Sequence, residues 1–255
     1  MKRQRLDQAI VAKGLIATRS QAESYIKLGH VSVDKQVVRK PGQFVTDGQK
    51  IDLKIDQQYV SRAGLKLAAV ADKFQLNFHD KVVLDVGSST GGFTDYALRH
   101  GAKKVIAVDV GTNQLHPNLR TNPNVELHEQ TDIRNVRLRQ AENEAVGDEK
   151  GVHIDIPDII VIDVSFISLR DVLPHVSMLM SPNSILVAMA KPQFEAQAAG
   201  LKHRGVIKND KMRRETLQHL ESWIKKLFII AEKADSEIAG AKGNQERFYL
   251  LKKTQ

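Results

Sequence analysis

Residues 81–94 of the chain read KVVLDVGSSTGGFT, an apolar strand followed by a glycine-rich turn and the start of a helix. Glycines in such a turn let the backbone approach a ligand closely, and the N-terminus of the following helix favours negative charge. The next predicted strand ends at Asp109, 22 residues after Gly87. An acidic residue about 20 positions on can accept hydrogen bonds from ribose hydroxyls. The two features together predict a site for a nucleoside-containing cofactor.

The glycine spacing in this turn is G-x-x-x-G-G, whereas dinucleotide sites carry G-x-G-x-x-G. A further acidic residue, Asp132, follows the third predicted strand and could face an adenine amino group. Both features favour S-adenosylmethionine over a dinucleotide. The plainer alternatives are a simple tight turn for the glycines and a helix cap for either Asp alone. The predicted cofactor-binding residues are Asp85, Gly87, Ser88, Gly91, Gly92, Phe93, Asp109, Asp132 and Asp163.

Outward from the turn, apolar runs of strand length alternate with helical segments from residue 59 onwards. Strands are expected at 81–85, 104–109, 125–128, 158–163, 184–190, 228–234 and 247–251, and helices at 94–100, 169–179 and 209–226. Apolar strands that alternate with helices are typical of a mostly parallel sheet covered on both faces. We therefore predict an α/β, Rossmann-like fold with a seven-stranded sheet. Residues 139–156 are charged and show no period, which indicates a loop or insertion.

The composition excludes several classes of protein. The 255-residue chain has no Cys, which rules out disulfide scaffolds, thiolate metal sites, iron–sulfur clusters and Cys nucleophiles. No apolar run approaches the ~18 residues of a membrane helix, and the N-terminus lacks the apolar core of a signal peptide. The nine His show no ligand spacing, so we expect no metal. A cytoplasmic protein without membrane contact is expected.

The first 58 residues form a separate unit with its own charge balance. They carry 11 Lys and Arg against 6 Asp and Glu, within a net charge of +8 for the whole chain. Their pattern predicts two helices within residues 5–28, a hairpin at 31–38 and a short strand at 51–53. A small basic unit fits binding to a polyanion, although ordinary solubility charge explains the composition equally well.

The residue order in this unit is more informative than its composition. Residues 5–38, RLDQAIVAKGLIATRSQAESYIKLGHVSVDKQVV, closely resemble the S-four-type RNA-binding domain of ribosomal proteins. The resemblance implies that the second helix and the following turn present basic side chains to folded RNA. Each basic residue alone is more simply a surface charge, but as a group they favour RNA contact. The candidate RNA contacts are Lys2, Arg3, Arg5, Arg19, Lys27, Lys35 and, after the boundary, Arg62.

Residues 59–255 resemble the FtsJ-type RNA 2′-O-methyltransferases, which carry a Lys-Asp-Lys-Glu tetrad. The matching residues are Lys66 in SRAGLKL, Asp163 in VIDVSF, Lys191 in AKPQFE and Glu246 in GNQERF. One departure is the cofactor turn, which reads SSTGGF where FtsJ-like proteins have AAPGGW. With the S-four-type domain at residues 1–58, the chain looks like the TlyA family. Proteins of that family are called hemolysins as well as ribosomal RNA cytidine 2′-O-methyltransferases.

The resemblance implies methyl transfer from S-adenosylmethionine to a ribose 2′-hydroxyl of ribosomal RNA, free or in a ribosomal subunit. A cytidine of the large subunit is the expected target, because the chain ends soon after its last strand, as the shorter members of the family do. Aligning the reacting atoms can supply roughly 7–11 kcal/mol. We expect Lys191 or Lys66 to accept the hydroxyl proton, with Lys191 preferred for its place at a strand end. Asp163 would orient the Lys pair, and Glu246 would hold the ribose or a Lys.

Three other readings compete with this one. A pore-forming hemolysin would need a spanning or strongly apolar segment, which the sequence does not offer. A non-catalytic RNA-binding assembly factor would not need an intact tetrad. A pseudouridine synthase would need a catalytic Asp in a Gly-Arg-Leu-Asp context, and the single Arg-Leu-Asp begins at Arg5, inside the RNA-binding domain. The oligomeric state is not predicted by the sequence.

Overall fold

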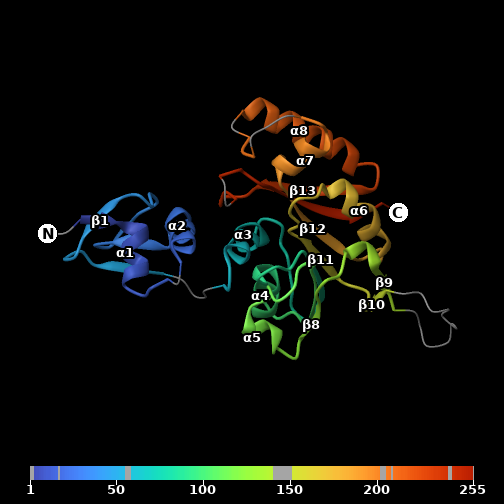
Figure 1. Cartoon of the computed structure of the whole chain (residues 1–255), viewed down its shortest axis with the longest axis horizontal. Helices are drawn as coiled ribbons and strands as arrows, with labels where there is room; N and C mark the ends of the chain where they lie inside the picture. Colours follow the sequence, from blue (N-terminus) through green and yellow to red (C-terminus); the bar gives the residue numbers. More distant parts are fainter. Residues whose placement is uncertain are drawn as a thin grey trace.

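The computed structural model describes residues 3–16, 18–54, 59–139, 151–201, 205–207, 209–240 and 243–254. A small N-terminal domain (residues 3–54) and a larger C-terminal domain (from residue 59) follow one another along the long axis of the molecule (Figure 1). The chain between them, residues 55–58, lies outside the described residues.

The N-terminal domain packs two short helices against short strands. Its elements are β1 Arg3–Arg5, α1 Leu6–Ala12, α2 Arg19–Leu28, β2 Val31–Val33, β3 Gln36–Val37, β4 Phe44–Thr46 and β5 Ile51–Leu53. The Thr18 side chain accepts a hydrogen bond from the Gln21 amide and starts α2, while Gly29, at φ 83°, ends it in the left-handed conformation. The predicted helices, hairpin and last strand are all present. The pairing of β1 with β4 was not predicted, because strands of three residues are too short to show a usable alternation.

The C-terminal domain is built on one seven-stranded sheet. The strand order is β13-β14-β12-β11-β6-β7-β8, in which β12, β11, β6, β7 and β8 run parallel and β14 runs antiparallel to β12. The strands are β6 Val82–Val86, β7 Lys104–Val108, β8 Val125–His128, β11 Ile159–Ile162, β12 Ile185–Ala190, β13 Phe228–Asp235 and β14 Arg247–Lys253. The predicted fold class is confirmed, and the predicted strands agree with the observed ones to within one or two residues.

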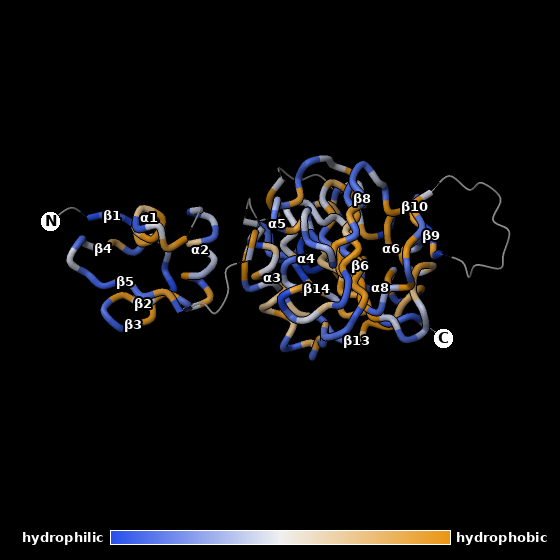
Figure 2. Tube along the Cα trace, turned by 90° about the horizontal axis from the view of Figure 1, so that it is seen from below, coloured by the Kyte–Doolittle hydropathy of each residue, from blue (hydrophilic) through white to orange (hydrophobic). Residues whose placement is uncertain are grey.

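Helices cover both faces of this sheet (Figure 1). They are α3 Arg62–Ala71, α4 Gly92–Arg99, α5 Pro117–Arg120, α6 Leu169–Met178, α7 Pro192–Ala198 and α8 Asp210–Ile224. One apolar cluster joins α3 and α4 to the sheet, and a second joins α6 and α8 to the other face. Figure 2 shows the apolar strands as a continuous band through the middle of the domain. Burial on both faces explains why these strands are apolar throughout.

The structure adds elements that the sequence did not reveal. Helix α3, which carries Lys66, was not predicted. Within residues 139–156, which we expected to be a loop, Val152–Ile154 forms β10 and pairs in parallel with β9, Val136–Leu138. The loop prediction is therefore wrong for these three residues, because the short strand finds its partner outside the segment. Residues 140–150 of the predicted loop lie outside the described residues.

Candidate active site

The register of the sheet brings three of the four tetrad positions to one edge. Asp163 and Lys191 directly follow β11 and β12, which are parallel neighbours. Glu246 directly precedes β14, whose first residue, Arg247, pairs with Ala190 at the end of β12. The end of one strand and the start of its antiparallel neighbour meet at the same edge, so Glu246 lies beside Lys191. Lys66 reaches this edge from α3.

Lys66 and Glu246 form the deeper of two ion pairs in the tetrad. The Lys66 Nζ lies 2.5 Å from Glu246 Oε2, and the two side chains are only 8% and 3% exposed. Burial raises the pKa of Glu246, and attraction to Lys66 offsets part of that effect. Taking both charges out of water is costly unless their geometry is held closely. This pair is therefore a fixed element of the site.

Lys191 and Asp163 form the second and more accessible pair. The Lys191 Nζ lies 2.6 Å from Asp163 Oδ1 and donates a hydrogen bond to Ser165 Oγ at 2.7 Å. The side chains of Lys191 and Asp163 are 11% and 17% exposed. The amine is thus fixed from two sides while it stays close to solvent.

The two pairs act on each other electrostatically. Asp163 raises the pKa of the Glu246 carboxyl and Lys191 lowers it, in addition to the larger contributions of burial and Lys66. The structure therefore brings together the four residues that the sequence singled out from four separate segments. Their pairing, Lys66 with Glu246 and Lys191 with Asp163, was not predicted.

A cavity of about 340 Å3 opens beside Asp163 at the same edge of the sheet. It lies where the strand order reverses direction between β6 and β11, which is where open α/β sheets bind ligands. The cavity therefore adjoins the Lys191–Asp163 pair. Its lining residues include Gly87, Asp109, Val110, Gln114, Asp132, Ile133, Asp163, Ser165, Phe166 and Ile167.

Asp109 and Asp132 both line this cavity, as a cofactor role requires. Asp109 accepts hydrogen bonds from the amides of Ser89 and Gly111, at 2.8 and 2.7 Å, which fixes its carboxylate at the end of β7. Asp132 is bound by the Arg134 guanidinium, and this hydrogen bond lowers the pKa of the Asp132 carboxyl. Each carboxylate also has the capacity to accept further hydrogen bonds.

The glycines of the predicted cofactor turn are also required by packing. A Cβ on Gly87 would lie 2.9 Å from the Asp163 carbonyl oxygen, and one on Gly91 would lie 2.3 Å from Leu119. A Cβ on Gly92 would clash with Ser61 and Ala63 at the start of α3. The turn is thus packed between α3, α5 and the Asp163 loop. Of the predicted turn residues, only Gly87 is among those that line the cavity.

Other predicted cofactor residues lie beneath the turn. Phe93 is 2% exposed and belongs to the apolar cluster under α3 and α4, and Ser88 is 5% exposed. Asp85 is 1% exposed, accepts a hydrogen bond from Thr94 Oγ1 at 2.6 Å and leaves its other oxygen, Oδ1, without a partner in the structure. Burial raises the pKa of Asp85 to about 7. These residues shape the site from below, and direct contact with a cofactor stays a prediction for them.

Two aromatic side chains at the mouth of the site were missed by the sequence analysis. Phe166 lines the cavity yet is 90% exposed, and its ring lies 5.2 Å from that of Phe194. Its backbone φ is +66°, a left-handed conformation that is strained for a bulky residue. The signal available in the sequence was the position of Phe166, three residues after a strand-end Asp, but the exposure of the ring could not be deduced from it.

Two polar residues near the tetrad have structural roles. The buried Glu195 accepts hydrogen bonds from Ser168 Oγ and the Leu169 amide, at 2.6 and 2.8 Å, and so holds the start of α6. The Asn244 side chain bonds to the backbone of Gly205 and Ile207 and thereby ties the segment before α8 to the Glu246 strand.

The predicted RNA-contact residues differ in their exposure and in whether another side chain binds them. The buried carboxylate of Asp7 accepts hydrogen bonds from Arg5 and Arg19 at 2.8–3.0 Å. Burial opposes ionisation of Asp7, but these bonds outweigh it and lower its pKa. Arg3, Lys27 and Lys35 are exposed on the same domain, and Arg62 is half-buried at the start of α3. Lys2 lies outside the described residues.

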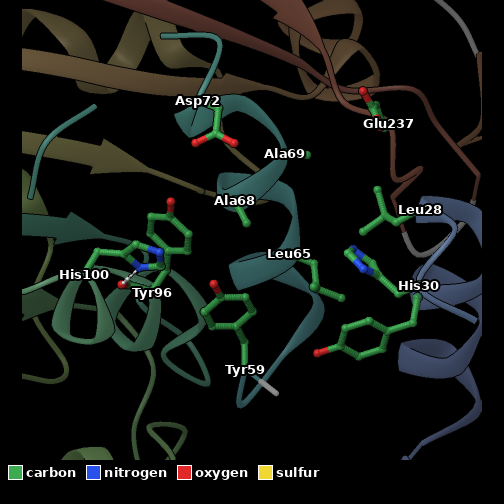
Figure 3. Close-up of a pocket in the computed structure, with 11 residues that line it drawn as sticks. Leu28, His30, Tyr59, Leu65, Ala68, Ala69, Asp72, Tyr96, His100 and Glu237 are labelled. Atoms are coloured by element: carbon green, nitrogen blue, oxygen red, sulfur yellow. Dashed lines mark hydrogen bonds between the residues drawn. The ribbon is translucent and has the colours of Figure 1, made fainter. Parts of the chain in front are cut away.

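Within the described ranges, no helix combines the length and apolarity that crossing a bilayer requires. A second cavity, of about 550 Å3, lies away from the tetrad, between the N-terminal domain and α3 and α4 (Figure 3). Five tyrosine and histidine rings are among its lining residues, namely Tyr25, Tyr59, Tyr96, His30 and His100.

Comparison with known families gives two matches along the chain. Residues 59–253 match the FtsJ-like methyltransferase family, and residues 4–51 match the S4 domain. The first match covers most of the chain and contains all four tetrad residues.

Individual relatives cover nearly the whole chain. Hemolysin A of Brachyspira hyodysenteriae is 37% identical over 95% of this chain and 97% of its own length. The 23S rRNA (cytidine-2′-O)-methyltransferase TlyA of Campylobacter jejuni is 39% identical over 80% of this chain and 75% of its own. A solved structure, "Putative hemolysin from Streptococcus thermophilus", is 36% identical over 100% of this chain and 90% of its own, with a TM-score of 0.67.

Proposed function

The chain belongs to the FtsJ-like methyltransferase family and carries an S4 domain, and on that premise we propose that it methylates a ribose 2′-hydroxyl of ribosomal RNA. The proposed acceptor is a cytidine of the large-subunit RNA, because the Campylobacter relative is named for methylation of a cytidine in 23S rRNA. One observation carries the proposal: two Lys–acid pairs meet at the edge of a cavity that is lined by Asp109, Asp132 and Asp163.

The cavity suits S-adenosylmethionine in the chemistry of its walls. Val110 and Ile133 offer apolar contact to an adenine ring, the Asp109 carboxylate can accept from ribose hydroxyls, and Asp132 can accept from the adenine amino group. The bare backbone at Gly87 brings the turn against the Asp163 loop. When bound, S-adenosylmethionine supplies a methyl group on a positively charged sulfur, which an oxygen nucleophile can attack.

Lys191 is the proposed proton acceptor. Its Nζ is held by Asp163 and Ser165, both of which line the cavity, so it is the Lys nearer to the proposed cofactor site. As the ribose 2′-oxygen attacks and the carbon–sulfur bond breaks, the hydroxyl proton passes to Lys191 Nζ and then to water. An amine accepts a proton only in its neutral form, so Lys191 must give up its own proton, which the ion pair with Asp163 holds, before the attack.

Lys66 and Glu246 have a different proposed role, which is to hold the sugar. The Lys66 ammonium is paired with a buried carboxylate and has three N–H donors, so it serves as a fixed cation and hydrogen-bond donor. Glu246 has a second carboxylate oxygen that can accept from a ribose hydroxyl. Orientation of the 2′-oxygen toward the methyl group is the expected contribution of this pair.

The exposed ring of Phe166 suggests how the nucleotide is presented. Unstacked RNA bases bind to aromatic side chains by stacking, and this ring stands at the mouth of the cavity with Phe194 behind it. We propose that the target base leaves its own stack and lies on Phe166.

Residues 1–58 are the proposed RNA-anchoring domain, and residues 59–255 are the proposed catalytic domain. Three basic side chains are exposed and can contact phosphates, namely Arg3, Lys27 and Lys35. Arg5 and Arg19 instead both donate hydrogen bonds to Asp7, which holds them side by side. An enzyme of ribosomal RNA acts where ribosomes are, so the proposed location is the cytoplasm.

The deciding experiment is methyl transfer to defined RNA substrates. The purified chain is incubated with S-adenosylmethionine labelled in its methyl group and with large subunits, small subunits or protein-free ribosomal RNA. We expect label at one ribose of the large-subunit RNA, read as a block to alkaline cleavage at that nucleotide. Label on a base, or binding without any label, contradicts the proposal. The second outcome is the one that a non-catalytic assembly factor predicts.

A further inference from the structure

The apolar core of the N-terminal domain does not end at the domain boundary. Leu65 of α3 and Ile238, in the segment between β13 and β14, are 4% and 2% exposed and belong to the same cluster as Tyr25 and Ile26 of α2. Figure 3 shows Leu65 projecting from α3 toward Leu28 and His30 of the N-terminal domain. The two domains therefore share packed side chains in addition to their linker.

This shared contact is narrow. The cavity of about 550 Å3 separates much of α2 from α3 and α4, with Leu28 and His30 on one side and Ala68 and Tyr96 on the other (Figure 3). The Gln21 side chain also donates to the Tyr59 carbonyl at 3.3 Å. Few side chains carry the contact, so truncating one of them changes it substantially.

Both contact residues lie next to the deeper ion pair of the tetrad. Leu65 immediately precedes Lys66 on α3. The segment of Ile238 is bonded to the backbone of Glu246, because the Ser236 amide donates to the Glu246 carbonyl at 2.9 Å and the Ser236 hydroxyl donates to the Ile238 carbonyl at 2.7 Å. The next part of the segment borders the carboxylate itself, since a Cβ on Gly240 would lie 2.6 Å from Glu246 Oε1.

The other ion pair has no such connection. Asp163 and Lys191 follow central strands β11 and β12, whose neighbours in the sheet hold them in register. Neither residue is adjacent in the chain to the cluster shared by the two domains. Docking of the N-terminal domain therefore contacts the segments that carry Lys66 and Glu246, and it reaches the Lys191–Asp163 pair only through the electrostatic interaction between the two pairs.

Resting on the methyltransferase function proposed above, we propose that Leu65 and Ile238 are positioning residues through which the docked N-terminal domain sets the geometry of the Lys66–Glu246 pair. Packed interiors transmit small displacements instead of absorbing them. The N-terminal domain thus contributes to the rate of methyl transfer as well as to RNA affinity.

The test compares two truncations in the full-length chain. Ile238→Ala removes three carbons from the shared part of the cluster, and Ile10→Ala removes the same three carbons from α1, away from the tetrad. Ile238→Val is the conservative variant. We expect Ile238→Ala to lower kcat by about 10-fold or more with an unchanged KM for RNA and an unchanged Kd for the cofactor. Ile10→Ala should keep the wild-type kcat, and Ile238→Val should have most of the wild-type kcat.

A second readout does not depend on activity. Lysine methylation by formaldehyde and a reducing agent, followed by mass spectrometry, reports the protection of each amine. In the wild-type chain Lys66 is protected by burial, and we expect Ile238→Ala to raise its labelling severalfold while Lys191 labelling stays constant. If Ile238→Ala is too unstable to purify, Ser236→Ala loosens the same segment without creating an apolar cavity.

The outcomes separate the two proposals. Equal kcat for Ile238→Ala and Ile10→Ala, or unchanged Lys66 labelling in the Ile238 and Ser236 variants, overturns the positioning role. A wild-type chain that methylates no RNA overturns the proposed function instead, and the labelling result then still decides whether docking controls the pair.

Discussion

The two domains use charge in opposite ways. In the N-terminal domain the basic side chains stand on the surface, and the single buried acid, Asp7, gathers Arg5 and Arg19 into one exposed cluster. In the C-terminal domain two Lys residues are withdrawn from water and each is matched by one carboxylate. Exposed charges act by number and are weakened by salt, whereas buried charges act by position. The same residue type therefore predicts binding in one domain and chemistry in the other.

The largest effect is expected from Lys191→Ala. Removing the proposed proton acceptor should lower the rate of methyl transfer by about 10²–10⁴-fold while cofactor affinity is kept, because the cavity walls are untouched. Single-turnover transfer of labelled methyl and calorimetric titration of the cofactor measure the two quantities. Lys211→Ala, at the exposed start of α8, is the matched control. A wild-type rate of methyl transfer in Lys191→Ala would contradict the assignment of Lys191 as the proton acceptor.

The deeper pair should matter more for stability than the shallower one. Lys66→Ala leaves Glu246 buried without its cation, and loss of one partner of a buried pair costs about 3–5 kcal/mol. Urea unfolding should therefore show a larger loss for Lys66→Ala than for Lys191→Ala. Adding Glu246→Gln to Lys66→Ala should restore part of the stability. Equal losses for the two Lys variants would mean that the difference in burial has no energetic consequence.

Asp85 should make stability fall as pH rises. Its pKa is raised to about 7 by burial, so the folded chain holds a proton that the unfolded chain has already released. The free energy of unfolding should decrease by about 2–3 kcal/mol between pH 5 and pH 7 on this account and then level off. In Asp85→Asn this part of the slope should disappear, as measured by urea unfolding at a series of pH values. An unchanged slope would show that Asp85 is not the titrating group.

The smallest effects belong to the exposed charges of the N-terminal domain. Lys27→Ala and Lys35→Ala should each weaken RNA binding a few-fold. In the double variant the slope of log K against log salt concentration should become shallower by about 2, because two phosphate contacts are lost. Binding titrations at several salt concentrations measure this slope, and kcat should stay at the wild-type value. Lys211→Ala again serves as the control. A loss of kcat in the double variant would contradict the division of labour between surface charge and buried charge.

Much of the C-terminal fold could be predicted because its signals are local. An apolar run such as Ile159–Ile162 must be buried on both faces, and a strand followed by Gly87 and a helix predicts the cofactor turn. Helix α3 was missed because the residues before it carry no clear helix-start signal, and its N-cap residue makes no side-chain capping hydrogen bond. Phe166 was missed because the exposure of an aromatic ring has no local signature in the sequence. The sequence explained Gly91 and Gly92 only by ligand approach. Packing also requires them, because a Cβ at either position would clash with side chains at α3 or α5.

The sequence by itself indicated most of the secondary structure, the fold class and the four candidate tetrad residues, because periodicity, turn chemistry and motif order are properties of neighbours along the chain. Only the tertiary structure decided which Lys pairs with which acid and how deeply each pair is buried. It also decided that Leu65 and Ile238 link the N-terminal domain to the Lys66–Glu246 pair. These depend on contacts between residues up to 180 positions apart, whose energies are set by burial and distance once the sheet has brought the strand ends together.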